Sequence, residues 1–395
     1  MKVLIYTHAF APRVGGVETF VMLLAQGLSE TPAPSGEKIR VTVATPTPAG
    51  EFDDSQLPFT VVRQPRIAEL WRLIGAADIV QLAGPAFLPL ALALLRGKVT
   101  VVEHHGYQAR CPNGLLFYEP TKTCCPGHFQ ARRYDLCLRC NAASVGWLGS
   151  ARLLLLTFPR RWLCKRATCN VPISHHVQTR LALPRSRVIH YGIPAPAESE
   201  CADTSPMNGW PVIGYVGRLV SEKGIPVLVE AARRLAARGC TFQLCLVGDG
   251  PERASLEAAI AQAGLSNRTQ ITGFLRDHEL QNVVRAIDIV VMPSVWEETA
   301  GLAAIEQMMR GRVVVASAIG GLGEVAEGGG IKFPPGDASA LADCLEQLLK
   351  DPSRRTEIGR RARAVALERY RQERMVADYI KLYRNCLAES SRSAW

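Results

Sequence analysis

The sequence contains no apolar run long enough to cross a membrane. Its longest apolar stretch, Ala83 to Leu95, holds Pro85 and Pro89 and falls short of the roughly 20 residues that a spanning helix needs. A secretory signal is also lacking, because the strand-length run from Met1 to Tyr6 is followed at once by polar and proline-containing sequence. We therefore expect a cytoplasmic protein in which Ala83 to Leu95 packs on a sheet as a helix.

Aromatic residues are few, and basic residues outnumber acidic ones. Only 7% of the chain is Phe, Trp or Tyr, and the cations are dispersed along it, which argues against a nucleic-acid partner. The 46 Lys and Arg residues exceed the 36 Asp and Glu residues by 10, and this balance favours an anionic partner without naming it. A hydrophobic share of 48% with 21% charged residues is ordinary for a globular α/β protein.

Two series of strand-like runs alternate with helical patterns. Each series predicts a mostly parallel sheet that is covered on both faces, and the proline-rich, polar stretch from Pro194 through Pro211 between them predicts a hinge. The chain is thus expected to form an α/β fold of two Rossmann-like, doubly wound domains with a cleft between them. The predicted strands lie near Val3–Tyr6, Arg40–Thr45, Ile79–Leu82, Val99–Glu103, Cys169–Ile173, Val212–Val216, Phe242–Val247, Thr269–Thr272, Asp288–Met292 and Arg312–Ala316.

Two carboxylates flank a glycine turn in the second series. The apolar run Ile287–Met292 precedes the turn, and Leu302–Met309 follows it with apolar residues at helical spacing, so Gly301 stands at a helix start. Free amides there, with the helix dipole, favour an anion such as a diphosphate. Glu298 would lie beside that anion, and Glu306 could accept hydrogen bonds from sugar hydroxyls. On spacing alone, two solvated surface acids would be the better interpretation.

A second phosphate-directed segment changes that balance. A buried strand that begins at Val212 leads into a glycine turn at Gly217, and the cations Arg218 and Lys223 follow. A guanidinium can bind two phosphate oxygens at once and an ammonium supplies a mobile charge, which suits a diphosphate that gains negative charge as it leaves. The alternative is a pair of solvated turn residues. Because glycine and cations recur where a parallel strand ends, the functional interpretation is favoured.

Taken in order, these motifs resemble those of a known family. They are similar to the C-terminal half of the retaining glycosyltransferases of family 4, the glycosyl transferases group 1, which have the GT-B fold. The likeness extends to the glycine loop Pro12–Glu18 and to Ile189–Ile193, although Tyr191 and Ala300 depart from the usual asparagine and phenylalanine. The motifs that carry it are Gly217-Arg218-Leu219, Lys223-Gly224, Val247 to Pro251, Pro293-Ser294, Trp296 to Glu298, Gly301, Glu306, and Gly320-Gly321 with Glu324.

The resemblance implies an architecture and a reaction. Residues 1–195 would form an acceptor domain with a cysteine-rich insertion at 106–146, residues 206–375 a nucleotide-sugar domain, and residues 376–395 a helix that returns to the first domain. Two such domains would face each other across a deep cleft. A sugar would pass, with retention and no catalytic cofactor, from a UDP-, GDP- or ADP-sugar to a glycan or lipid-linked glycan in cell-surface polysaccharide or glycolipid synthesis. A nucleotide-sugar epimerase of the same fold is the alternative, and a zinc-stabilised basic nucleic-acid-binding protein is a remote one.

The implied donor site combines cations, glycines and a helix start. Arg218 and Lys223 would hold the diphosphate, Glu306 the ribose, and Gly16 would close over the phosphates. Exclusion of water on closure would limit hydrolysis and strengthen these contacts. The departing phosphate would help to deprotonate the acceptor, with no carboxylate placed as a covalent nucleophile. The expected donor-binding residues are Gly15, Gly16, Arg218, Lys223, Gly248, Ala300, Gly301, Leu302 and Glu306.

Glu298 and His105 are the expected catalytic residues, and both would address the transferred sugar. His104 and His105 follow a strand, so at least one imidazole should lie at the cleft rim, where it could bind a sugar hydroxyl or orient the acceptor. By resemblance the histidine directly before the glycine is the one in the active site, which selects His105 and leaves His104 in reserve. His175 and His176 are expected to be core histidines bonded to backbone groups.

Five cysteines lie between Cys111 and Cys140. The segment Cys137-Leu138-Arg139-Cys140 has the two-residue gap of a metal knuckle, and a reducing cytosol argues against disulfides. We expect a structural tetrathiolate zinc loop formed by Cys111, Cys124 or Cys125, Cys137 and Cys140. One knuckle is only half of a zinc signature, so a set of free thiols is nearly as well supported.

The stretch 147–166 combines leucines, two tryptophans and a basic cluster. This composition is typical of a helix that lies on a membrane surface. It is equally typical of a domain helix with an apolar side in the core and a basic side in water. The first interpretation would make the protein peripheral on the inner face of the cytoplasmic membrane.

Overall fold

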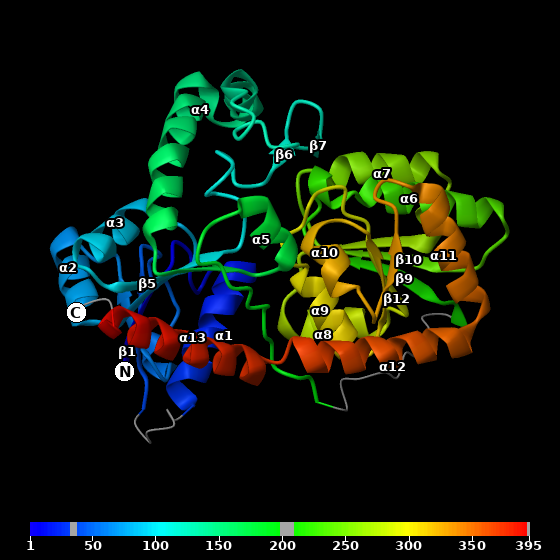
Figure 1. Ribbon diagram of the computed structural model, residues 1–395. Helices are drawn as coiled ribbons and strands as arrows, with labels where there is room; N and C mark the ends of the chain where they lie inside the picture. The colour runs from blue at the N-terminus through cyan, green and yellow to red at the C-terminus, as the bar shows by residue number, and fades with distance from the viewer. Residues whose placement is uncertain (32–37, 198–208, 393–395) are drawn as a thin grey trace. The chain divides into compact units, whose positions relative to one another are not determined.

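The computed structural model describes residues 1–31, 38–197 and 209–392, and its elements are drawn in Figure 1. Residues 198–208, which make up most of the predicted hinge, lie outside the described residues. The same holds for residues 393–395, at the end of the predicted terminal helix.

The chain divides into two compact units. The first contains Met1–Pro120, Cys125–Pro194 and Tyr370–Trp395, so it is built from both ends of the sequence. The second contains Thr121–Cys124 and Ala195–Arg369. Each unit holds its own six-stranded sheet.

The sheet of the first unit is parallel throughout. Its strands are β1 (Lys2–Tyr6), β2 (Arg40–Thr45), β3 (Thr60–Arg63), β4 (Ile79–Leu82), β5 (Val99–His104) and β8 (Cys169–Pro172). They lie in the order β3-β2-β1-β4-β5-β8, so the chain changes direction across the sheet between β1 and β4. Every residue of β4, β5 and β8 is buried, because a parallel sheet is covered on both faces and leaves neither to water.

Helices from distant parts of the sequence complete the first unit. They are α1 (Gly16–Glu30), α2 (Ile67–Ala76), α3 (Phe87–Leu95), α4 (Tyr134–Arg166), α5 (His175–Leu181) and α13 (Gln372–Arg392), with the 3₁₀ turn η1 (Asp54–Gln56). Helix α13 packs against α1, where Gln372 Nε2 donates to the Leu23 carbonyl at 2.7 Å. The apolar stretch Ala83 to Leu95 ends in α3, which packs on β4 and β5 as expected. Two short strands, β6 (Phe117–Tyr118) and β7 (Thr123–Cys124), form a small separate sheet.

The second unit repeats the same winding. Its strands are β9 (Val212–Val216), β10 (Gln243–Val247), β11 (Thr269–Gly273), β12 (Ile289–Met292), β13 (Val313–Ser317) and β14 (Ile331–Phe333). All pairs are parallel and the order is β11-β10-β9-β12-β13-β14, which places the switch point between β9 and β12. Open α/β sheets bind their ligands at such a point, at the carboxyl ends of the strands.

Helices surround this second sheet. They are α6 (Ile225–Ala237), α7 (Arg253–Gln262), α8 (Asp277–Arg285), α9 (Leu302–Met309), α10 (Gly320–Val325), α11 (Ala338–Lys350) and α12 (Pro352–Arg369), with the 3₁₀ turns η4 (Ser221–Lys223) and η5 (Ser266–Arg268). Fully buried Tyr215, Phe242 and Phe333 belong to its apolar core, together with side chains of α6 and α11.

The predicted α/β fold of two doubly wound domains is confirmed. Every strand expected from the sequence is present, and both sheets have the Rossmann strand order. In the two six-stranded sheets, β3 and β14 were not predicted, and each lies at an edge of its sheet. The short strands β6 and β7 were not predicted either. In the part of the chain that the structure describes, no helix is both long enough and apolar enough to cross a bilayer.

Candidate functional site

The loops that follow β9 and β12 bring the predicted charged residues to one edge of the second sheet. Gly224 lies in the left-handed region at φ 64°, and a Cβ there would come within 2.1 Å of the Pro293 carbonyl oxygen. Only glycine therefore allows these two loops to touch. The contact is fastened by a hydrogen bond of 3.1 Å from the Val295 amide to the Glu222 carbonyl.

Gly248 allows a second close approach on the other side of β9. It has φ 139°, and an added Cβ would stand 1.9 Å from the carbonyl oxygen of Gly217. The Leu219 amide also donates to the Asp249 carbonyl at 2.9 Å. These contacts fix the backbone on which Arg218 stands.

Lys223 and Glu298 form an ion pair between the two loops. Lys223 Nζ lies 2.8 Å from Glu298 Oε1, and the side chain of Glu298 is only 4% exposed. The hydroxyl of Ser294 donates to the same carboxylate oxygen. Lys223 Nζ also lies 5.9 Å from the ring centre of Trp296. Two residues that the sequence places in different motifs, 75 positions apart, are thus in direct contact.

Arg218 is held by its backbone and leaves its guanidinium in solvent. The Tyr215 hydroxyl donates to the Arg218 carbonyl at 2.8 Å, and burial followed by the charge of Glu298 raises the pKa of Tyr215. The Arg218 side chain is 73% exposed, and a carboxylate oxygen of Glu222 lies 3.7 Å from its guanidinium. An exposed pair of this kind contributes little, so an arriving anion has little to displace.

Helix α9 begins without a side-chain cap. Gly301 is its N-cap residue, with φ 96°, and it has no side chain to accept a bond from the first amides. The amides of the first turn, which begins at Leu302, carry the positive end of the helix dipole and are suited to an anion. Ala300, just before them, is buried.

The loop that carries Glu298 is also held from the side of α10. The Gly321 amide donates to the Glu298 carbonyl at 2.6 Å. Gly320 has φ 61° and approaches the backbone of the same residue so closely that a Cβ would lie 2.5 Å from its carbonyl oxygen. Backbone contacts therefore fix Glu298 independently of its side chain.

Glu306 lies in the second turn of α9 and is partly buried. Burial raises the pKa of its carboxyl group, and the charge of Arg310 opposes that shift. A carboxylate at this depth can accept hydrogen bonds in a setting from which water is largely removed.

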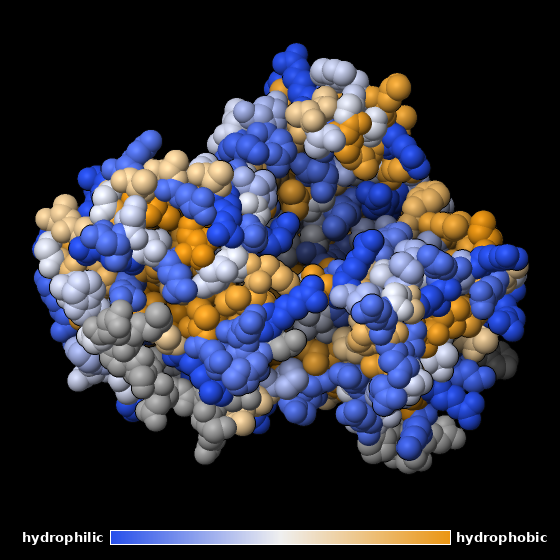
Figure 2. All heavy atoms as spheres, turned by 180° about the vertical axis from the view of Figure 1, so that it is seen from behind, coloured by the Kyte–Doolittle hydropathy of each residue, from blue (hydrophilic) through white to orange (hydrophobic). Residues whose placement is uncertain are grey.

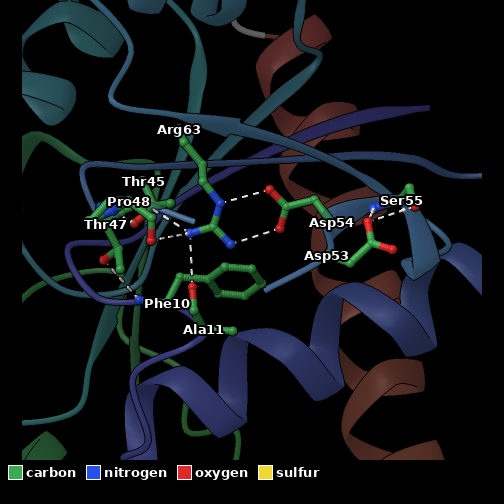
Figure 3. Close-up of polar contacts among 9 residues, drawn as sticks. All are labelled: Phe10, Ala11, Thr45, Thr47, Pro48, Asp53, Asp54, Ser55 and Arg63. Atoms are coloured by element: carbon green, nitrogen blue, oxygen red, sulfur yellow. Dashed lines mark hydrogen bonds and ion pairs between the residues drawn. The ribbon is translucent and has the colours of Figure 1, made fainter. Parts of the chain in front are cut away.

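The first unit carries its glycine loop at the end of β1. Gly15 precedes α1 and Gly16 begins it, and a Cβ on Gly16 would meet nothing within 4 Å, so the backbone there is open to a ligand. Figure 3 shows how the start of this loop is held. Arg63 donates to the carbonyls of Ala11 at 2.8 Å, Thr47 at 3.0 Å and Pro48 at 3.2 Å.

Arg63 is itself oriented by a carboxylate. Its guanidinium makes two bonds of 2.7 Å to Asp54, the forked geometry that gives the strongest arginine pairs. The rings of Phe10 and Phe52 lie 5.7 and 5.9 Å from its central carbon. The cluster ties η1 and the end of β3 to the loop that leads to Gly15 (Figure 3).

His105 lies inside a chain of hydrogen bonds in the first unit. Its Nδ1 is 2.7 Å from the Tyr191 hydroxyl and its Nε2 is 3.2 Å from Glu103 Oε2, so both ring nitrogens have protein partners. Burial, followed by the charge of Glu103, raises the pKa of Tyr191, which keeps its proton at neutral pH. We infer that Tyr191 donates to Nδ1 and that the imidazole carries its proton on Nε2, facing Glu103.

Glu103 joins that histidine to the C-terminal helix. Its carboxylate, fully buried, accepts from His105, from Gln81 Nε2 at 2.8 Å and from the hydroxyl of Tyr379 on α13. Tyr383 on the same helix donates to the side-chain amide oxygen, Oε1, of Gln81. Burial raises the pKa of Glu103, while the bonds from His105 and Tyr379 oppose the shift.

The other histidines lie elsewhere. His104 is fully buried, its Nε2 is 2.9 Å from Asn170 Oδ1, and burial lowers its pKa to about 4 against the effect of that bond. It is a neutral interior group at physiological pH. The expectation of a core position is wrong for His175, which is exposed, because it is the first residue of α5 after the cap Ser174. His176 is only partly buried.

The predicted zinc loop is not supported. Across residues 1–31, 38–197 and 209–392, no group of three or more His, Cys, Asp or Glu side chains could hold a metal ion. Cys124 donates to the Val295 carbonyl at 3.3 Å, while Cys111 donates to Asn113 Oδ1 at 2.9 Å and Cys140 to the Phe117 carbonyl at 3.4 Å. Burial is the main cause that raises the pKa of Cys111 to about 11 and that of Cys137 to about 12.

Cys111 and Cys137 therefore keep their protons at neutral pH, and Cys111, Cys124, Cys125, Cys137 and Cys140 are not joined by disulfides. They behave as small buried groups with weak hydrogen bonds. Of the two alternatives that the sequence left open, the set of free thiols is the one that the structure supports.

Several residues of these sites carry no clear sequence signal. Arg63 is a lone cation at the end of an edge strand, and Tyr379 is more than 270 positions from the glutamate that it contacts. Glu103 was predicted only as the end of a strand. Ser294 is the exception, since it belongs to the Pro-Ser motif that closes β12 and could have been found there.

Comparison with known proteins points to one family. The sequence profile of the family described as Glycosyl transferases group 1 matches residues 202–365. The 2-deoxystreptamine glucosyltransferase of Streptomyces kanamyceticus is 38% identical over 219 residues, 50% of this chain and 56% of the relative. The alpha-D-kanosaminyltransferase of the same organism is 32% identical over 206 residues, 49% and 53% of the two chains. The chain thus spans about half the length of these curated relatives.

Solved structures share the whole fold at low identity. The crystal structure of Anabaena HepE in complex with UDP has a TM-score of 0.73 at 19% identity, over 98% of this chain and 100% of that one. Sucrose-phosphate synthase from Thermosynechococcus elongatus has a TM-score of 0.70 at 20% identity, over 98% and 100%. At such identities the likeness concerns the fold, which is GT-B. The matched profile makes residues 202–365 similar to the glycosyl transferases group 1.

Proposed function

We propose that this protein transfers a sugar from a nucleotide diphosphate sugar to an acceptor hydroxyl. The observation that carries the proposal is the Lys223 to Glu298 ion pair at the β9–β12 switch point, beside a helix start that has no side-chain cap. A cation, a nearly buried carboxylate and free amides at that edge suit a group that is anionic at one end and rich in hydroxyls at the other.

The charge of each residue suggests its role in binding the donor. Arg218 and Lys223 hold the diphosphate, and the amides around Ala300 to Leu302 add donors to it. Glu306 accepts from the ribose hydroxyls. When the donor arrives, Lys223 exchanges its pairing with Glu298 for the phosphate, and the carboxylate of Glu298 is released toward the sugar. Negative charge that develops on the leaving diphosphate is then stabilised by groups already in position.

In the first unit, Gly15, Gly16 and His105 complete the proposed machinery. An open backbone at Gly16 suits approach to the donor phosphates. His105 offers the transferred sugar or the acceptor a ring nitrogen only if the hydroxyl of Tyr191 gives up its bond to Nδ1. Gly248 acts through the backbone of the loop that holds Arg218.

We also propose the finer properties that the family-4 resemblance implies. Transfer would proceed with retention at the anomeric carbon, the departing phosphate helping to deprotonate the acceptor, in a cytoplasmic enzyme that needs no catalytic cofactor. The Anabaena HepE structures in complex with UDP and with UDP-glucose make UDP-sugars the first donors to test, ahead of GDP- and ADP-sugars.

Two classes of acceptor follow from the same reasoning. One is a glycan or lipid-linked glycan in cell-surface polysaccharide or glycolipid synthesis. The other is a small aminocyclitol, because relatives from Streptomyces are named as transferases that act on 2-deoxystreptamine. Both classes present a hydroxyl as the nucleophile, so the donor chemistry is the same for each.

The first experiment is a screen of nucleotide sugars for thermal stabilisation, since a ligand that binds the folded state raises apparent stability according to its affinity. The stabilising donor is then incubated with each acceptor class, and products are followed by mass. Sugar transfer that needs an acceptor is the expected result. Conversion of the donor sugar without acceptor would assign the epimerase alternative instead, and failure of every nucleotide sugar to stabilise the protein would contradict the proposal.

A further inference from the structure

The second half of α4 has an outward face that its own unit does not cover. Leu148, Leu155 and Trp162 recur every seven residues, which places them on one side of a helix. Their side chains are 91%, 67% and 55% exposed. Isolated exposed leucines are common, but a row of large apolar groups along one helix is not.

A corner in α4 extends this face. Gly146 has φ 69° and ψ 170°, outside the helical region, so two helices meet there at an angle. Val145 and Trp147, on either side of the glycine, are both exposed. Figure 2 shows hydrophobic residues at the surface of the projection at the top of the view, which α4 forms. We call Val145, Trp147, Leu148, Leu155 and Trp162 the outer α4 face.

Packing against the rest of the unit does not use these residues. The inward side of α4 is formed by other side chains, among them Leu154, Thr157 and Leu163, all of which are buried. The helix therefore has two apolar sides. Its inward side accounts for the domain-helix interpretation of residues 147–166, and the outer α4 face remains to be explained.

The charge along this part of the chain has one sign. No Asp or Glu occurs between Asp135 and Glu198. Arg152 and Arg166 are exposed, and each stands four residues after a member of the outer α4 face, on the same side of the helix. The Arg166 guanidinium lies 4.8 Å from the ring centre of Trp162.

We propose that the outer α4 face docks on an anionic lipid bilayer. Leucine and tryptophan side chains enter the boundary between headgroups and acyl chains, while arginines on the same side reach the lipid phosphates. Tryptophan is favoured at that boundary. A stretch without acidic residues fits a surface of negative charge. Docking is independent of the proposed transfer reaction, although it would bring a lipid-linked acceptor to the enzyme.

The test is flotation of the full chain with vesicles of phosphatidylcholine and phosphatidylglycerol, and with vesicles of phosphatidylcholine alone. We expect binding to the anionic vesicles only. The double variant Leu148→Ser and Trp162→Ser should lower the bound fraction by about tenfold or more, because it removes two large apolar side chains that the proposal places in the bilayer. Phe274→Ser is the matched control, since Phe274 is an exposed aromatic with an arginine near its ring in the second unit.

Each other outcome counts against docking. Equal flotation of the double variant and the parent would overturn it, and so would equal binding to neutral vesicles. A parent that is dimeric by light scattering, with a monomeric double variant, would assign the face to a second copy of the chain. Unchanged melting temperatures show that the variants fold. Because no nucleotide sugar is present, failure here is distinct from failure of the proposed function.

Discussion

The two units use the carboxyl ends of their strands in opposite ways. In the second unit the charged groups meet at a surface, where Arg218 is exposed and Lys223 pairs with Glu298. In the first unit His105 is already bonded at both ring nitrogens within a buried network. In the second unit the Arg218 guanidinium is exposed and can bind a ligand, whereas in the first unit the polar groups around His105 are hydrogen-bonded to one another. A ligand must therefore compete for His105, but it meets an open guanidinium at Arg218.

The largest effect is expected at Arg218. Arg218→Ala should lower kcat/KM by about 10² to 10³-fold. This corresponds to a loss of about 2.7 to 4 kcal/mol of transition-state stabilisation, the range for one preorganised donor. It should leave the melting temperature unchanged, because the side chain is exposed. Steady-state kinetics with the donor found in the screen measures the loss. Arg233→Ala is the control, because Arg233 forms an exposed ion pair with Glu230 in the same unit. Equal activities of the two variants would remove the distinction between the units.

Substitution of Glu103 should lower the free energy of unfolding. Glu103→Ala leaves three buried donors without their acceptor, those of His105, Gln81 and Tyr379. At about 1 kcal/mol for each orphaned donor, the free energy of unfolding should fall by about 3 kcal/mol. Urea denaturation measures it, with Glu51→Ala at an exposed position as the control. A loss no larger than that of the control would mean that the network is not what holds α13.

Tyr191→Phe should have a smaller effect of the same kind. It removes the hydroxyl bonded to Nδ1 of His105 while keeping the ring, so the expected cost is about 0.5 to 1.5 kcal/mol. The ¹⁵N NMR signal of Nδ1 should shift as that nitrogen loses its donor. Should the signal stay in place, the phenol is not the partner of the imidazole, and the contrast between the units weakens.

The smallest expected effect is a pH dependence at Glu306. Its pKa is raised by burial, so the folded state holds the proton more tightly than the unfolded state. Glu306 therefore favours folding below its unfolded pKa and loses that contribution as pH rises through its folded pKa. Glu306→Gln removes this dependence. From pH about 4 to about 7 the variant should gain stability relative to the parent.

Denaturation of the Glu306→Gln variant and its parent across that interval measures the difference in unfolding free energy. Glu357→Gln, at an exposed helix position of the same unit, should show a flat difference. A flat difference for Glu306→Gln as well would show that its carboxyl group has the same pKa in the folded and unfolded states.

Sequence patterns predicted the central strands of each sheet and one edge strand of each, β8 and β11, but missed the strand at the other edge. The central strand β12 is apolar at every position because both faces are covered, and that pattern is visible in the sequence. The edge strands β3 and β14 are only partly buried, and their mixed residues do not stand out from loops. Partial burial at an edge weakens the signal on which the prediction depends.

The same limit applies to the sites. Arg218, Lys223 and Glu298 follow strands in glycine-containing turns, a local pattern that could be recognised. The contacts of Tyr379 with Glu103, and of Arg63 with Ala11, join residues far apart in the chain. Such contacts come from the winding of the fold, not from any short segment. The zinc prediction is not supported for a related reason, since cysteine spacing does not reveal that the Cys124 thiol donates to the Val295 carbonyl.

The central claim is that a diphosphate is bound by Arg218, Lys223 and the first amides of α9. Calorimetric titration of UDP and UMP into the parent and into the double variant Arg218→Ala and Lys223→Ala tests it most directly. The account predicts that the parent binds UDP more tightly than UMP by at least about tenfold, and that the double variant loses this preference. Equal affinity of the parent for the two nucleotides, or a preference that survives in the double variant, would contradict it.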